Sequence, residues 1–275
     1  MPFPGRQDRY PGKDDVADYL ASYAAHFDLD VRHDTPVRRL RRRDGRFEAE
    51  TDGGIHRADT VVVATGPFQK PYVPALASAF GTTVTQLHSA AYRNPEQLPP
   101  GPVLVVGGGN SGVQIAAELA ATHEVTLAVG KDRPVMPQRV LGADVFTWLR
   151  ALGIVRAPVT GRLGRLVKSR DPLIGKGPGH IRRHGVTITG RLTPGTALTP
   201  KSVIWATGYT ADYPWLDIPG ALDAAGRPLQ SFGAGPIPGL FHLGLSFQHS
   251  RGSALLGWVG EDADMIAGWV TAPPS

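Results

Sequence analysis

Three glycines with the spacing GxGxxG are the feature of this sequence with the clearest chemical meaning. They lie in VLVVGGGNSG, residues 103–112. In a dinucleotide-binding loop the first glycine allows a tight turn, the second lets the backbone approach a pyrophosphate, and the third lets a helix pack closely on a strand. The pyrophosphate then meets the N-terminus of that helix. The predicted nucleotide-binding residues are Gly107, Gly109, Asn110, Ser111 and Gly112.

The surroundings of the motif decide its meaning, because 34 glycines in 275 residues make the spacing alone a weak signal. The apolar run at 103–106 predicts a strand, residues 110–121 predict a helix, and residues 125–129 predict a second strand. Together they span about 27 residues, close to the length of about 30 expected for a βαβ unit. The sequence therefore predicts a true dinucleotide loop.

The end of the second strand indicates which dinucleotide is bound. An NAD site usually has a carboxylate there for the ribose 2′-hydroxyl, whereas cations suit the 2′-phosphate of NADP. Here the strand runs into Gly130, followed by Lys131, Asp132 and Arg133. The first position has no carboxylate and two cations follow it, which favours NADP; Asp132 is the residue that opposes this interpretation.

Composition excludes several kinds of chemistry. The chain contains no cysteine, which excludes disulfides, thiolate zinc sites and a redox-active cysteine pair. Redox chemistry would therefore have to come from a bound cofactor. No apolar run approaches the roughly 18 residues of a spanning helix, and residues 1–15 contain no apolar segment of a secretory signal. We expect no membrane partner and a cytoplasmic location.

The net charge is +5, and much of the excess lies in RRLRRRDGR, residues 38–46. Such a run can be a nucleic-acid patch or the charged edge of a hairpin. Asp44-Gly45 is a turn pair typical of two-residue hairpins, and the following FEAET alternates as a strand does. No aromatic residues interleave with the arginines as a stacking surface requires. We therefore expect a hairpin and no nucleic-acid partner.

Further elements follow from periodicity and turn residues. Residues 14–27 predict a helix with one apolar face. Three short extended runs should then form a meander that leads into a buried strand at 60–64, and the proline-rich stretch 95–102 suggests a domain boundary. The remaining elements expected are a helix at 144–152, loops with short strands over 156–200, a strand at 202–206 and a helix at about 253–270.

The sequence ATG ends two apolar runs, in VVVATGP at 61–67 and in VIWATGY at 203–209. Paired ATG segments on either side of a GxGNSG loop resemble the flavoproteins with two dinucleotide-binding domains, and most of all the flavin-containing monooxygenases and their bacterial relatives. QLHSAAY at 86–92, ATGYTADYPWL at 206–216 and RGSALLGWVGEDA at 251–263 also resemble segments of that family. The likeness extends over roughly residues 8–270.

The resemblance implies an α/β fold in which an NADP-binding domain is inserted into a discontinuous FAD-binding domain. It places the NADP domain at 99–200 and the FAD-type domain at 1–98 and 201–275. It implies NADPH and FAD as cofactors, with oxygen and a small molecule as substrates. The cofactor-binding residues that it adds are Thr65, Gly66, Thr207, Gly208, Gly252 and Ser253, together with Lys131 and Arg133.

Two residues are candidates for catalysis. His88 lies near the domain interface by resemblance, and a buried histidine bonded to backbone groups is the alternative. Arg251, at the start of the last predicted helix, could meet a flavin or NADP phosphate or form a surface ion pair. His180 and His184 share a helical spacing but have no carboxylate partner, so no metal site is expected.

One departure from the family concerns the flavin. The family opens with a strand and a GxGxxG that hold the FAD diphosphate, whereas this chain begins downstream of that unit and has one such loop. We therefore expect an incomplete FAD domain, an exposed sheet edge that favours a homo-oligomer, and the possibility that Met1 is an internal start. The alternatives to a monooxygenase are a non-catalytic NADP-binding protein and a reductase that passes electrons to a partner.

Overall fold

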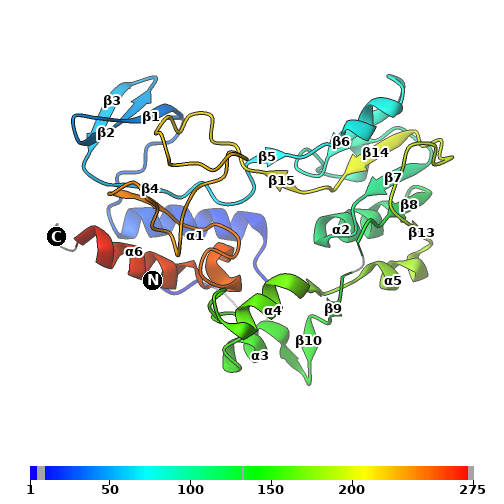
Figure 1. Ribbon diagram of the computed structural model, residues 1–275. Helices are drawn as coiled ribbons and strands as arrows, with labels where there is room; N and C mark the ends of the chain where they lie inside the picture. The colour runs from blue at the N-terminus through cyan, green and yellow to red at the C-terminus, as the bar shows by residue number, and fades with distance from the viewer. Residues whose placement is uncertain (5–9, 132, 272–275) are drawn as a thin grey trace.

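The computed structural model describes residues 1–4, 10–131 and 133–271. It is a mixed α/β molecule with two halves, joined by a pair of crossing segments and by a long excursion of the chain (Figure 1). We call them the nucleotide half, which carries the glycine loop, and the flavin half, which carries the first ATG segment and both chain ends. The predicted fold class, α/β with a parallel sheet around the loop, is confirmed.

The nucleotide half is built on five parallel strands in the order β13-β8-β7-β14-β6. Their bounds are Thr85–His88 for β6, Val103–Val106 for β7, Val125–Ala128 for β8, Thr187–Thr189 for β13 and Ser202–Trp205 for β14. Strand β7 is apolar throughout, and β14 is apolar after the buried Ser202, because both faces of the sheet are covered. Helix α2 (Asn110–Leu119) packs on one face, and the 3-10 helix η1 (Ala75–Ala79) lies against the other.

This sheet extends beyond the residues expected for the NADP domain. Strands β6 and β14 lie outside 99–200, and the proline-rich stretch 95–102, which contains the 3-10 helix η2 (Pro95–Gln97), connects two strands of the same sheet. We therefore propose that the nucleotide-binding unit runs from about residue 85 to 206. The boundary at residue 98 stays a prediction; it rested in part on local composition, which carries no information on the pairing of β6 with β14.

The flavin half contains two smaller sheets and two helices. Strands β1 (Val37–Arg43), β2 (Arg46–Thr51) and β3 (Gly54–Ala58) form the predicted antiparallel meander. Strand β4 (Val61–Val63) pairs in parallel with β16 (Leu240–His242). Helix α1 (Lys13–His26) agrees with the prediction but buries no residue. The predicted helix at 253–270 is divided, into the 3-10 helix η4 (Arg251–Ala254) and the helix α6 (Val259–Thr271).

The arginine-rich run forms the expected hairpin. Asp44 and Gly45 both adopt positive φ, +49° and +80°, as a tight two-residue turn requires. Its arginines face carboxylates of neighbouring segments: the ion pairs are Arg38–Asp52, Arg39–Asp217, Arg41–Glu48, Arg41–Glu50 and Arg46–Asp59. The charge of this run is therefore largely balanced within the fold.

Between β8 and β13 the chain leaves the sheet and reaches the flavin half (Figure 1). This excursion contains β9 (Val135–Met136), β10 (Arg139–Val140), β11 (Ala143–Asp144), α3 (Val145–Ala151), α4 (Arg162–Arg170), β12 (Leu173–Ile174), α5 (Pro178–Ile181) and the 3-10 helix η3 (Arg182–His184). The backbone N–H of Gly252 donates to the Val155 carbonyl at 3.0 Å, and the rings of Phe146 and Trp258 lie 5.4 Å apart. The excursion is thus a second connection between the halves.

Candidate nucleotide-binding site

The three glycines of the loop have three different surroundings. Gly107 has φ +121°, and a Cβ there would lie 2.2 Å from the carbonyl oxygen of Ala206. A Cβ on Gly112 would lie 1.8 Å from the Gly107 carbonyl oxygen. In contrast, a Cβ on Gly109 would meet no atom within 4 Å. The first and third glycines are therefore required by the fold, whereas the second keeps a space open next to the backbone.

The open space lies at the N-terminus of α2. Gly109 is the N-cap in an extended conformation, and no side chain caps the helix. The first N–H groups of a helix have no partner within the helix, and they carry the positive end of its dipole. Asn110 and Ser111 contribute two of these N–H groups. The loop therefore presents a cradle suited to a phosphate group.

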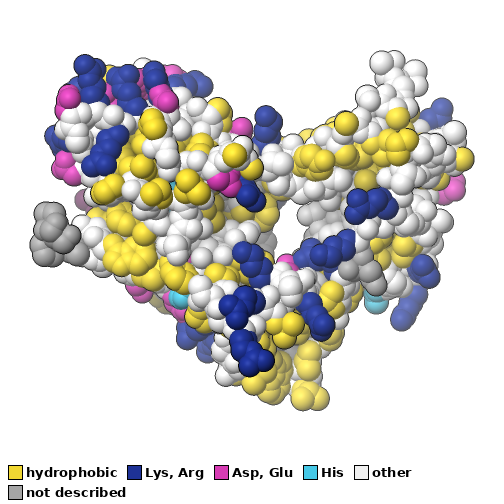
Figure 2. Space-filling view, viewed as in Figure 1, with side chains coloured by type: hydrophobic (Ala, Val, Ile, Leu, Met, Phe, Trp, Pro, Cys, Tyr) yellow, Lys and Arg dark blue, Asp and Glu magenta, His cyan; other side chains and the backbone are white. Residues whose placement is uncertain are grey.

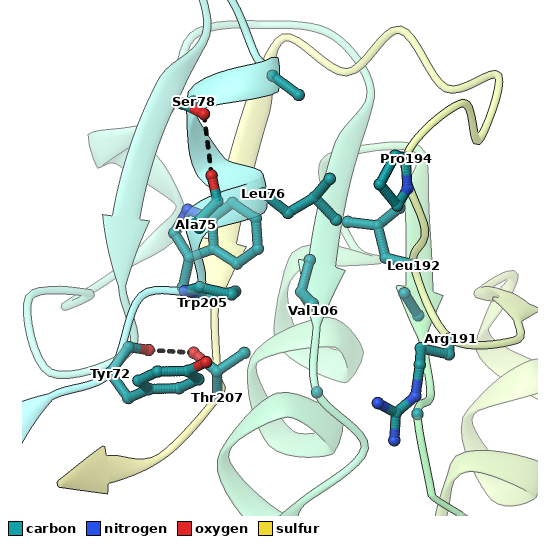
Figure 3. Close-up of a pocket in the computed structure, with 15 residues that line it drawn as sticks. Tyr72, Ala75, Leu76, Ser78, Val106, Arg191, Leu192, Pro194, Trp205 and Thr207 are labelled. Atoms are coloured by element: carbon teal, nitrogen blue, oxygen red, sulfur yellow. Dashed lines mark hydrogen bonds between the residues drawn. The ribbon is translucent and has the colours of Figure 1, made fainter.

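A cavity of about 660 Å³ opens beside the cradle. Val106, Ala128 and Trp205, the last residues of three neighbouring strands, line its base together with Gly107. Residues 72–79 line the opposite side, and Leu192 and Pro194 contribute to the far end (Figure 3). This position, outside the carboxyl ends of parallel strands, is where open α/β sheets bind nucleotides.

Arg191 is the cation that the structure brings to the cavity. It follows β13, its side chain is turned toward the cavity in Figure 3, and its Nε lies 3.5 Å from the place of a Cβ on Gly130. Gly130 follows β8, where the ribose 2′ position is read in this fold. Sequence reasoning missed Arg191 because residues 156–200 show weak periodicity. Its position directly after a short strand, two residues beyond Thr189, was the feature that could have indicated it.

The two cations predicted from the sequence lie elsewhere. Arg133 donates to both the carboxylate and the carbonyl of Asp171, at 2.6 Å and 2.7 Å from Nη2. Lys131 is exposed, and Asp132 lies outside the described residues. Arg133 therefore already holds a carboxylate, whereas Arg191 lies at the cavity.

The two ATG segments meet side by side. Each is followed by a short strand, β5 (Lys70–Pro71) and β15 (Tyr209–Thr210), and the two strands pair antiparallel (Figure 1). Gly66 and Gly208 both adopt positive φ, +67° and +82°, with open space around them. The chain therefore leaves the flavin half and returns to it along two paired segments.

The threonines of both segments form side-chain hydrogen bonds at this junction. Thr207 donates from its hydroxyl to the Tyr72 carbonyl. Thr65 accepts from the Gln69 amide at 2.7 Å, and the same Gln69 accepts from the backbone N–H of Asp212 at 2.6 Å. The bonds of Thr207 to Tyr72 and of Asp212 to Gln69 tie the two segments together.

His88 lies at the same junction, 8% exposed. Its Nδ1 accepts from the backbone N–H of Ala90 at 3.1 Å, so its Nε2 carries the proton and donates to the carbonyl of Gly208 at 2.9 Å. Both ring nitrogens are engaged with backbone groups. This arrangement favours a positioning role for His88 over proton transfer.

Arg251 and Arg133 bind the same carboxylate, that of Asp171. Arg251 Nε donates to Asp171 Oδ1 at 3.0 Å, while Arg133 contacts Oδ2 of the same carboxylate. The neighbouring residues of η4 are structural as well: a Cβ on Gly252 would lie 2.8 Å from Trp258 Cβ, and Ser253 Oγ accepts from two backbone N–H groups. The bridge ties the segment after β8 to η4 in the flavin half.

Residues 2–152, more than half of the chain, match the family model described as pyridine nucleotide-disulphide oxidoreductase. The chain belongs to this family. It is 41% identical to a Geobacillus kaustophilus protein named "Uncharacterized oxidoreductase CzcO-like", over 97% of this chain and 80% of that protein. It is 26% identical to a probable indole-3-pyruvate monooxygenase of Arabidopsis thaliana, over 92% of this chain and 72% of the relative.

A solved structure supports the same relationship. The flavin-containing monooxygenase from Stenotrophomonas maltophilia superposes with a TM-score of 0.75 and 26% identity, over 98% of this chain and 80% of that chain. The resemblance to flavin-containing monooxygenases is thereby confirmed. This oxidoreductase is an enzyme of a flavin- and pyridine nucleotide-dependent family, as expected.

Buried polar groups gather on the flavin side of this oxidoreductase, close to the end of β16. His242 is 1% exposed, its Nδ1 has no hydrogen-bond partner among the described residues, and burial lowers its pKa to about 4. Asp262 is 2% exposed; its Oδ1 lies 3.4 Å from His249 Nδ1 and its Oδ2 has no partner. Sequence reasoning missed both residues: His242 belongs to no motif, and Asp262 lies within the segment 251–263, whose resemblance to the family singled out Arg251, Gly252 and Ser253 instead.

Two further expectations concern metals and spanning helices in the described residues. His180 and His184 have ring centroids 5.9 Å apart, and among the described residues no cluster of three or more metal-ligating side chains is found. Within residues 1–4, 10–131 and 133–271, no helix is long and apolar enough to cross a membrane.

Proposed function

We propose that this chain is an NADPH- and FAD-dependent oxidoreductase of monooxygenase type, which oxidises a small molecule with oxygen. The observation that carries the proposal is the open cradle at Gly109, at an uncapped helix N-terminus beside a cavity of about 660 Å³. The similarity to a flavin-containing monooxygenase over 98% of this chain supports the same conclusion.

Each part of the site has a role in this proposal. The N-terminus of α2 holds the pyrophosphate, and Arg191 contacts the 2′-phosphate at the edge of the cavity. The paired segments β5 and β15 orient the nucleotide half toward the flavin half, and His88 supports that junction through the Gly208 carbonyl. FAD, when bound, would accept hydride from NADPH and react with oxygen.

A reductase that passes electrons to a partner is the second candidate. The family description includes disulphide oxidoreductases, but the sequence contains no cysteine to form a redox-active pair. A reductase of this chain would therefore have to deliver electrons from the flavin directly to a partner. Oxygen consumption distinguishes this candidate from a monooxygenase.

A nucleotide-binding protein without flavin chemistry is the third candidate. It is favoured by the asymmetry of the halves: in the described residues β4 pairs with β16 alone, and the sequence contains one GxGxxG. The NADP cradle is open to a phosphate group, whereas Gly252 and Ser253, the residues of η4 expected to bind FAD, are engaged in packing and in backbone hydrogen bonds. Flavin content of the purified protein decides this point.

The experiment is to purify the chain with added FAD and follow NADPH oxidation and oxygen uptake together. A monooxygenase consumes both, whereas a reductase consumes NADPH only when an acceptor such as ferricyanide is supplied. A colourless protein that binds NADPH without oxidising it would favour the third candidate. Failure to bind NADPH at all would contradict every version of the proposal.

Gly109→Ala tests the cradle directly. Its backbone, φ −76° and ψ 177°, accepts any residue, and a Cβ there meets no protein atom. We expect the variant to remain folded and to bind NADPH about tenfold more weakly or worse, because the backbone can no longer approach the pyrophosphate. Gly268→Ala, also without a neighbour within 4 Å, is the matched control and should bind normally.

Arg191→Ala tests the preference for NADPH. Loss of one charge-assisted contact should weaken NADPH binding by roughly tenfold or more and leave NADH binding unchanged. Arg183→Ala, an exposed cation of η3, is the control for a general loss of charge. Equal weakening of NADPH and NADH would show that Arg191 does not read the 2′-phosphate.

A further inference from the structure

The excursion between β8 and β13 carries the positive charge of the chain. Eight of the 29 Lys and Arg residues and one of the 24 Asp and Glu residues lie between 133 and 170, which leaves 21 basic and 23 acidic residues elsewhere. The protein outside this segment is therefore slightly acidic. A single segment accounts for the whole basic excess.

Most of these cations form no ion pair with a described residue, although Arg139 lies opposite Asp144 in the hairpin β10–β11. Arg133 pairs with Asp171 and Arg156 with Glu261. The other six have no ion pair with any described residue; they are Arg139, Arg150, Arg162, Arg165, Lys168 and Arg170. The arginine hairpin β1–β2 differs, because its cations are matched by carboxylates. The charge of the excursion is therefore available to a partner.

Helix α4 presents leucines among these cations. It contacts the protein through Gly164, where a Cβ would lie 2.0 Å from the Pro158 carbonyl oxygen. Leu163 and Leu166 remain 45% and 50% exposed. A short helix that carries exposed leucines and many cations, with no acidic residue, has the composition of helices that lie on membrane surfaces.

The hairpin β10–β11 and helix α3 add apolar side chains next to α4. Leu141 at the hairpin tip is 88% exposed and holds a positive φ of +50°, in a turn that usually carries Asn or Gly. Trp148 donates from Nε1 to the Val140 carbonyl, and Leu152 is 66% exposed. Figure 2 shows hydrophobic side chains at the lower end of the molecule with Lys and Arg side chains above them, where Figure 1 places α3, β10 and α4.

We propose that this surface, formed by β10–β11, α3 and α4, docks on an anionic lipid membrane. An anionic bilayer satisfies both components: the unpaired cations meet lipid headgroups, and the exposed leucines and Trp148 enter the interface. A second copy of the chain fits poorly, because a two-fold contact would bring like charges together. A nucleic acid would contact the cations but gain nothing from Leu141, Leu152 and Leu166.

The expectation that no membrane is involved rested on the lack of a spanning run. Surface docking requires no such run, so the two statements concern different kinds of association. The proposal is also independent of the nucleotide site, since none of the docking residues lines the cavity of about 660 Å³.

The test is co-sedimentation of the whole chain with vesicles of phosphatidylcholine, with and without phosphatidylserine. We expect binding to the phosphatidylserine vesicles that weakens as salt is raised. Arg162→Glu with Arg165→Glu should weaken binding by at least about tenfold, and Leu141→Ser with Leu152→Ser should weaken it at unchanged net charge.

Matched controls are Arg43→Glu with Arg183→Glu, which changes the net charge equally, and Leu229→Ser, at an exposed leucine elsewhere. Far-UV circular dichroism and the urea denaturation midpoint should be unchanged in all of these variants, which reports that they are folded whatever the outcome at the nucleotide site. The proposal is overturned if the chain ignores phosphatidylserine vesicles, or if the charge control loses as much binding as the variant in α4. It is also overturned if the chain binds duplex DNA in place of vesicles, with Leu141→Ser and Leu152→Ser without effect.

Discussion

The nucleotide half and the flavin half repeat the same arrangement with one difference. In each, a strand that ends in Ala-Thr-Gly pairs in parallel with a later or earlier strand: β14 with β6, and β4 with β16. Strand β14 also pairs with β7, the strand that carries the glycine loop. In the described residues the other edge of β4 has no partner, and Val62 is 40% exposed. The nucleotide half therefore has both a phosphate cradle and a second partner for its ATG strand. In the described residues of the flavin half, neither is found.

Two histidines make the comparison more detailed. His88 ends β6 opposite Trp205, and His242 ends β16 opposite Val63, so each faces the residue that precedes Ala-Thr-Gly. Both nitrogens of His88 are bonded to backbone groups, whereas Nδ1 of His242 has no partner. The two histidines thus occupy equivalent positions, but only His88 has hydrogen-bond partners for both ring nitrogens among the described residues.

The largest effect should come from the glycine that closes the cradle. Gly112→Ala would place a Cβ 1.8 Å from the Gly107 carbonyl oxygen, so the helix must move off the strand. We expect a loss of about 3 kcal/mol in the free energy of unfolding, measured by urea denaturation. Gly109→Ala, three residues earlier in the same motif, should change it by less than about 0.5 kcal/mol. Similar losses in both variants would refute the different roles assigned to the two glycines.

The dependence of folding stability on pH should reveal the burial of His242. Burial lowers the pKa of His242 from 6.5 to about 4, so the unfolded chain takes up a proton that the folded chain refuses. Stability should therefore fall by about 2 to 3 kcal/mol as the pH decreases from about 6.5 to 4. His242→Gln should flatten that slope, and the exposed His33→Gln should not. A slope that persists in His242→Gln would assign the effect to another group.

Local features of the fold were predictable from the sequence, and long-range ones were not. The glycine loop, α2 and the Asp44-Gly45 turn depend on neighbouring residues, so their spacing was sufficient. The pairing of β6 with β14 joins residues more than 100 positions apart, and no periodicity records it.

The site was predictable to the same extent. The cradle residues follow from the glycine motif. Arg191 reaches the cavity because β13 pairs with β8, and the weak periodicity of residues 156–200 could not predict that pairing. An ion pair was the alternative considered for Arg251, but the sequence could not identify Asp171 as its partner or as the partner of Arg133, because Asp171 lies 80 and 38 residues away from them.

Matched substitutions in the two ATG strands give the finest test of the comparison. Val203 in β14 is fully buried between two strands, whereas Val62 in β4 is 40% exposed beside a single partner. Val203→Ala should lower the free energy of unfolding by about 2 kcal/mol, because it removes two buried methyl groups and leaves a cavity. Val62→Ala should cost about 0.5 kcal/mol or less, since little surface is buried there. A cost at Val62 equal to that at Val203 would mean that the outer edge of β4 is covered in solution, and binding partners or self-association of the chain would then explain what covers it.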